Sequence, residues 1–94
     1  MVRFSAGMGM PVISRFYGIV ITMYYNDHAP PHFHARHERD EVVVEIHGGL
    51  VKGRMSKRAL RFVLEWAEQH QDELLEDWNR ARDRRPLEPI PPLR

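Results

Sequence analysis

The chain has 94 residues, of which 43% are hydrophobic and 29% charged, and its formal net charge is +1. This length and composition predict one folded domain with a single small core. The sequence has no cysteine, which excludes disulfides, thiolate metal sites and cysteine nucleophiles and fits a cytoplasmic protein. Because the net charge is small, any contact with nucleic acid must come from a local basic patch. The longest apolar run, residues 16–23, is too short to span a bilayer, so no membrane partner is expected.

The chain divides into an extension, a domain and a tail. Residues 1–10 are small and glycine-containing without periodicity, and they predict a flexible N-terminal extension. A single α+β domain is expected over residues 11–85. The stretch RRPLEPIPPLR ends the sequence, and its proline content predicts that residues 86–94 form an extended C-terminal tail against the surface.

The first half of the domain has the composition of β-strands. The apolar run ISRFYGIVITMYY predicts one central strand that is contacted on both faces. A loop follows it, and Pro30 and Pro31 cannot donate to a ladder, so pairing is expected to resume after them. Val42, Val44 and Ile46 alternate with polar residues, as in a half-buried strand. Strands are thus predicted at residues 13–25, 32–38 and 41–47, with a short fourth strand at residues 50–55 after a glycine turn.

The second half of the domain has a helical pattern. Ser56 is a good N-cap residue, and no proline or glycine follows until Pro86. An apolar stripe of 3.6-residue period predicts one helix over residues 57–84, or two helices if the chain breaks near His70. Trp66 falls off this stripe, so its ring is expected at the margin of the core or against a partner. The stripe consists of Leu60, Val63, Leu64, Ala67, Gln71, Leu74, Leu75, Trp78 and Ala81.

These elements predict an α+β fold: an antiparallel meander of three to four strands, packed on one face by a long C-terminal helix or two consecutive helices. In the strand at residues 32–38, Phe33 and Ala35 point to one face, and His32, His34 and Arg36 point to the other. Apolar positions belong under the helices, so the histidines are expected to face away from them. The uncovered face would then present an imidazole cluster to a ligand or partner.

Three stretches, MPVISRFYGIVI, NDHAPPHFHAR and RALRFVLEWAEQHQDELLEDW, resemble the small bacterial proteins catalogued as domain of unknown function 4160. Members of that family look like compact cytoplasmic proteins, often encoded beside another small protein in an arrangement similar to toxin–antitoxin pairs. The resemblance, together with the uncovered sheet face and the basic start of the predicted helix, predicts a toxin-like component of a two-gene module that acts through the neighbouring gene product and through RNA. A homo-oligomer is a further option. No activity comes with the family, so whether the protein is an enzyme stays open.

The histidines of the second stretch predict a metal site. Such a site needs three or four imidazoles or carboxylates that converge on one point. His32 and His34 lie two apart on a predicted strand, and His28 could complete the set from the loop. Glu45 or His47, from the next strand, could serve as a fourth ligand or an outer-shell group. One transition metal such as zinc would make this a metal-binding protein or a small hydrolase. The alternative is a set of solvated imidazoles without a ligand.

An acid–base site without metal is a further alternative. His32 and His34 could exchange protons with a ribose hydroxyl and a leaving oxygen, and Arg36 could stabilise the phosphorane charge. That arrangement would make the protein a small ribonuclease. The alternative rests on matching residues to roles, because the sequence contains no established hydrolase motif.

Basic residues crowd the start of the predicted helix. Cations at a helix N-terminus oppose its macrodipole, so their placement there points to a counter-charge from outside the helix. Nucleic acid or an acidic partner is therefore expected to bind Arg54, Lys57, Arg58 and Arg61. Further along the helix, acidic side chains predict a solvated face with pairs such as Glu76 and Arg80.

Overall fold

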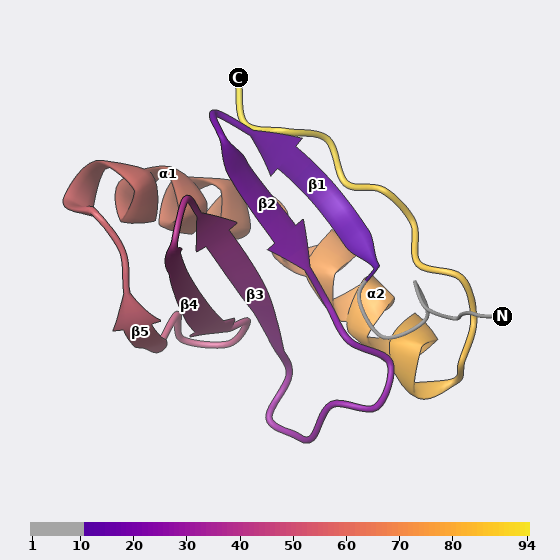
Figure 1. Ribbon diagram of the computed structural model, residues 1–94. Coiled ribbons are helices and arrows are strands. Elements are labelled where there is room, and N and C mark those ends of the chain that lie inside the picture. Colours follow the sequence, from indigo (N-terminus) through magenta and orange to yellow (C-terminus); the bar gives the residue numbers. More distant parts are fainter. Residues whose placement is uncertain (1–10) are drawn as a thin grey trace, which may run out of the picture.

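The computed structural model describes residues 11–94, which form an antiparallel β-sheet with two helices packed on one face (Figure 1). This arrangement confirms the predicted α+β fold and the two-helix alternative. The expected extension at residues 1–10 lies outside the described residues. The sheet contains β1 (Val12–Phe16), β2 (Ile19–Thr22), β3 (His32–His37), β4 (Asp40–Glu45) and β5 (Val51–Arg54), neighbours in chain order. The helices are α1 (Lys57–Gln69) and α2 (Gln71–Arg82).

The prediction of one central strand at residues 13–25 is wrong, because the chain reverses at Tyr17 and Gly18 to form the hairpin β1–β2. Phe16 pairs with Ile19 across the turn, and both turn residues have positive φ, 51° at Tyr17 and 76° at Gly18. A two-residue type I′ hairpin turn requires this conformation. The sheet therefore has five strands, one more than the upper limit of the prediction.

The face of the sheet under the helices forms the core. Phe33 and Ala35 of β3 are fully buried there, and Val42 and Val44 of β4 are almost fully buried, as the alternation predicts. Trp66 was expected at the core margin, but none of its surface is exposed. Its ring packs against Phe16 of β1 and Phe33 of β3, with ring centroids 5.4 and 5.7 Å away. The helix-stripe pattern does not show this, because the packed face of α1 is wider than the stripe.

Local bonds set the helix boundaries. The Ser56 hydroxyl accepts a hydrogen bond from the Ala59 amide at 3.2 Å, which confirms the predicted N-cap. The helical run breaks at His70, which ends α1 and precedes α2. Just after the break, Gln71 donates from its side-chain amide to the Ile46 carbonyl at 2.7 Å, which explains a polar residue on the apolar stripe. Within residues 11–94, neither helix has the length and apolar character needed to cross a membrane.

The C-terminal tail follows β1 at the edge of the sheet (Figure 1). The Ile90 amide donates to the Ile13 carbonyl at 2.8 Å, and the Trp66 indole donates to the Pro91 carbonyl at 2.8 Å. Ile90 and Leu93 are only 4% and 6% exposed. The tail therefore covers the edge strand and adds apolar side chains to the core.

Candidate functional site

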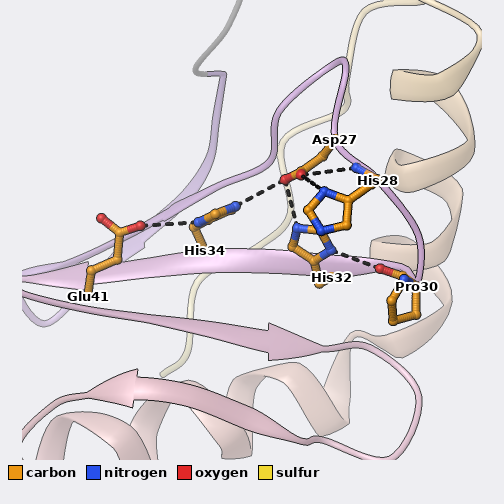
Figure 2. Close-up of polar contacts among 6 residues, drawn as sticks. All are labelled: Asp27, His28, Pro30, His32, His34 and Glu41. Atoms are coloured by element: carbon orange, nitrogen blue, oxygen red, sulfur yellow. Dashed lines mark hydrogen bonds and ion pairs between the residues drawn. The ribbon is translucent and has the colours of Figure 1, made fainter.

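A carboxylate and two imidazoles converge where the loop after β2 enters β3 (Figure 2). Asp27 comes from the loop, while His32 and His34 lie two apart on β3 and so point to the same side of the strand. The Nε2 atoms of His32 and His34 lie 2.7 and 3.1 Å from the same oxygen, Oδ2 of Asp27. One potential ligand atom from each residue lies within 4.8 Å of the others, the compactness that a single metal ion requires.

The loop fixes the Asp27 carboxylate in this position. Its Oδ1 atom accepts a hydrogen bond from the His28 backbone amide at 3.1 Å, so Oδ2 is left to face the two rings. Burial alone would raise the pKa of Asp27, but hydrogen bonds from His34 and His32 and the His28 amide outweigh it and hold the pKa below its usual range. Asp27 is therefore ionised at neutral pH and presents a negative charge to both imidazoles.

The second nitrogen of each ring also faces an oxygen. Nδ1 of His32 lies 2.8 Å from the Pro30 carbonyl, and Nδ1 of His34 lies 3.1 Å from Oε2 of Glu41 on β4. Histidines that bind metals commonly donate their other ring N–H to a backbone carbonyl or a carboxylate, which fixes the ring's orientation and tautomer. Pro30 and Glu41 occupy those two positions here (Figure 2).

The Nε2 atoms of His32 and His34 can bond to the Asp27 carboxylate only if a proton or a cation lies between them. A neutral imidazole carries one N–H, and if His32 donates that proton from Nδ1 to the Pro30 carbonyl, it has no proton left to donate to Asp27. The lone pair of His32 Nε2 would then point at the ionised Asp27 oxygen 2.7 Å away. The same argument applies to His34 between Glu41 and Asp27. A proton or a metal cation must therefore lie between Asp27 and each ring.

The other residues expected at the metal site lie around this group. The His28 side chain is 89% exposed, with Nδ1 3.3 Å from the outer Asp27 oxygen, Oδ1. Glu45 is paired with His32 across β3 and β4, and His47 is exposed in the turn after β4. Among the described residues, the converging ligand atoms belong to Asp27, His32 and His34. The group does not include His28, Glu45 or His47. The structure thus brings together two of the three predicted histidines and adds a carboxylate.

His32 departs from the expectation that both histidines face away from the helices. It is only 6% exposed, and its ring lies 5.2 Å from that of Trp78 on α2. Strand alternation gives the direction of a side chain relative to the sheet, but it does not show that α2 packs beside the start of β3. His34 remains on the outer face as expected. There it lines a groove with Arg15, Arg36 and Glu41.

Arg36 has a smaller part in the site than the acid–base alternative requires. Its side chain is 55% exposed, and its guanidinium lies 3.8 Å from Glu41, which in turn contacts His34. Arg36 thus reaches the cluster through Glu41 and the groove rather than through Asp27.

Asp27 and Glu41 are the two site residues that sequence reasoning missed. Asp27 stands next to His28 in the histidine-rich stretch, and carboxylates are common partners of histidine in metal sites, so its type and position gave a signal. The sequence signal for Glu41 is weaker. Glu41 lies opposite Arg36 in the β3–β4 register, which the short turn between these strands sets.

The predicted basic residues lie at the other end of the sheet strands, around the start of α1. Arg54, Lys57, Arg58 and Arg61 are all exposed. Within residues 11–94, no carboxylate lies within ion-pair distance of these four, whereas the predicted pair of Glu76 and Arg80 is formed at 3.2 Å. Lys57, Arg58 and Arg61 therefore lie in the first turns of α1, whereas Arg54 is the cross-strand partner of Glu41, which contacts His34.

The fold and the site define a small α+β protein with a histidine–carboxylate cluster at the start of the central strand of an antiparallel meander. The chain belongs to the family described as Domain of unknown function (DUF4160), whose model matches residues 18–79. The matched region contains Asp27, His32, His34 and Glu41 as well as the start of α1. Comparisons with curated proteins and with solved structures gave no match.

Proposed function

We propose that the protein binds one divalent transition metal ion, zinc in the first instance, through Asp27, His32 and His34. The observation that carries the proposal is the pair of short Nε2–Oδ2 contacts, at 2.7 and 3.1 Å, between rings whose other nitrogens already face acceptors. A divalent cation bound by both Nε2 atoms and Oδ2 gives every one of these nitrogens and oxygens a suitable partner. Two imidazoles and one carboxylate suit zinc or ferrous iron.

The proposed centre is of the catalytic type. Three protein ligands leave at least one coordination position for water or substrate, whereas structural zinc sites use four protein ligands. Zinc in such a site lowers the pKa of its bound water to about 7, which supplies a hydroxide nucleophile. The groove beside His34 also contains Arg15 and Arg36, whose positive charges suit an anionic substrate such as a phosphate ester. The activity we propose is therefore the hydrolysis of an anionic ester.

The metal-free alternative places a proton on each Nε2 atom instead. If Nδ1 of each ring keeps its proton as well, His32 and His34 are both imidazolium ions with ring centroids 5.3 Å apart, sharing one carboxylate oxygen. Like charges at this separation repel each other, although Asp27 and Glu41 reduce the repulsion. One metal ion satisfies the same contacts without two adjacent cations on the rings. This comparison favours the metal site over a ribonuclease built on His32, His34 and Arg36.

Metal analysis of the full chain tests the proposal. The protein should be purified without an affinity tag, its metal content measured, and zinc binding to the metal-stripped protein followed by calorimetry. We expect one zinc ion per chain. Asp27→Asn and His34→Gln should each weaken zinc binding by more than about a hundredfold, because even outer-shell changes at metal sites lower affinity about 10- to 100-fold.

Two matched variants separate the possible ligand sets. His28→Ala removes an exposed histidine beside the site and should leave zinc affinity unchanged, while Glu41→Gln should weaken it about 10- to 100-fold as an outer-shell change. A loss that is much larger in His28→Ala than in Asp27→Asn would instead indicate the ligand set His28, His32 and His34. A parent protein that binds no metal, and whose thermal midpoint zinc does not change, would contradict the metal site altogether.

The exposed cations at the start of α1 favour a second candidate function. In it the protein is the toxin-like component of a bacterial, cytoplasmic two-gene module and acts through the small protein of the adjacent gene and through RNA. Co-expression with that protein, followed by size-exclusion chromatography, should yield a complex, and expression of the chain alone should slow growth. Independent elution together with normal growth would contradict this function.

A further inference from the structure

One side chain of the β1–β2 turn and three side chains of α1 form a cluster at the far end of β3 from the Asp27 site. Tyr17 of the β1–β2 turn packs on Phe62 of α1, with ring centroids 4.9 Å apart. The guanidinium carbons of Arg58 and Arg61 lie 5.7 and 5.6 Å from the centroid of the same Phe62 ring. We name Tyr17, Phe62, Arg58 and Arg61 the stacking surface. It borders a shallow groove that His37 and Ser56 also line.

The position of Tyr17 is locally unfavourable. Its φ of 51° lies in the left-handed region, where a bulky aromatic residue is rare and where Asn, Asp or Gly is preferred in a type I′ turn. Burial does not account for the aromatic ring, because Tyr17 is 55% exposed. An exposed aromatic side chain held in an unfavourable backbone conformation suggests a role outside the fold.

The positions of the two arginines are unfavourable for a different reason. Arg58 and Arg61 lie in the first turns of α1, where positive charge opposes the helix macrodipole, and the first turn has no acidic residue. Within the described part of the chain, neither arginine forms an ion pair. Both guanidinium groups lie instead over the partly buried ring of Phe62, and Lys57 and Arg54 lie close by in sequence and are exposed.

We propose that the stacking surface binds single-stranded nucleic acid, with a base stacked on Tyr17 and the backbone phosphates held by Arg58 and Arg61. Proteins bind single strands with this combination of an aromatic platform and nearby cations. A double helix offers phosphates but keeps its bases stacked inside, so it leaves the Tyr17 ring without a partner. An acidic peptide would use the cations alone. A single-stranded RNA would supply the RNA contact of the second candidate function. Its binding here is independent of the metal centre.

Fluorescence anisotropy of the full chain with a labelled single-stranded RNA of about ten nucleotides, a typical site length, provides the test. Asn is favoured in the turn, so Tyr17→Asn removes the ring without harming the hairpin. We expect this variant to bind about five- to a hundredfold more weakly, the effect of losing one stacked base, with a thermal midpoint no lower than the parent's. Tyr17→Phe keeps the ring and should bind as the parent does.

The charged residues are tested by salt dependence. Arg58→Gln and Arg61→Gln should each reduce the slope of log affinity against log salt by about 0.7, the value for one phosphate contact on a single strand. Arg82→Gln, an exposed arginine at the end of α2, is the matched control and should change nothing. Tight binding of a DNA strand of the same sequence would support the proposal equally.

Three results would overturn the proposal. They are no binding by the parent, unchanged binding by Tyr17→Asn, and binding of an RNA duplex as tight as that of the single strand. None of them bears on zinc binding at Asp27, or on the complex with the neighbouring gene product, which are measured separately.

Discussion

Asp27 and Asp77 show how the partners of each carboxylate oxygen determine its role. Both oxygens of Asp27 face donors or the two imidazoles, and its pKa is held low. Asp77 of α2 is only 1% exposed, with Oδ1 accepting from the Glu88 amide at 2.8 Å. Its Oδ2 atom has no hydrogen-bond partner among the described residues, and burial raises its pKa. Asp27 thus stays ionised and faces the two imidazoles, while the buried Asp77 bonds the tail to α2.

The raised pKa of Asp77 predicts a pH-dependent effect of Asp77→Asn. A raised pKa in the folded protein means that the carboxyl's contribution to stability is fully present below its unfolded pKa, about 3.9, and is lost as pH rises through the folded value. Asparagine keeps an oxygen for the Glu88 amide and never ionises. Urea unfolding should therefore show the variant gaining stability relative to the parent at neutral pH, with the gain shrinking toward about pH 3.9. A difference that does not change with pH would contradict this account.

At the scale of elements, α1 begins with cations in a position that its dipole disfavours, so the N-cap matters. The Ser56 hydroxyl satisfies the Ala59 amide, and the helix has no acidic residue in its first turn to help. We expect Ser56→Ala to lower the free energy of unfolding by about 1 kcal/mol, measured by urea denaturation. Ser56→Thr keeps an acceptor oxygen and should lose less. If the two variants were equally stable, the capping bond would not contribute.

The elements also show which features are encoded locally. Alternation in residues 41–47 and the helix stripe after Ser56 follow from side-chain period, and both were predicted. The β1–β2 turn was missed because Tyr17-Gly18 is a weak turn signal between two apolar runs that are both buried. The break at His70 could only be left open, since neither proline nor glycine marks it.

The candidate site also contains some residues that the sequence predicts and others whose place depends on the tertiary structure. His32 and His34 were predicted because positions two apart on a strand share a side. Asp27 was missed because its meeting with them depends on the path of the loop between β2 and β3, which sequence spacing does not give. The contact between His32 and Trp78 depends on how α2 packs on the sheet, because the two residues are 46 positions apart in the chain.

At the scale of the whole molecule, the C-terminal tail covers β1, which would otherwise be an exposed edge strand of the sheet. Edge strands expose unpaired backbone groups and invite association with other chains. Here the Ile90 amide pairs with the Ile13 carbonyl, and Ile90 and Leu93 complete the core beside β1. The Pro91 carbonyl also satisfies the buried indole of Trp66. The tail therefore joins β1 to α1 and acts as part of the folded unit.

This role predicts that the tail is needed for stability. Ile90→Ala should lower the free energy of unfolding by about 2–4 kcal/mol, the usual effect of truncating a buried isoleucine, whereas Pro92→Ala at an exposed position should have little effect. Deletion of residues 87–94 removes Ile90, Leu93 and the acceptor of the Trp66 indole together, and it should abolish the cooperative transition followed by tryptophan fluorescence. A deletion variant that melts like the parent would show instead that the sheet and helices are stable alone, with the tail only resting on them.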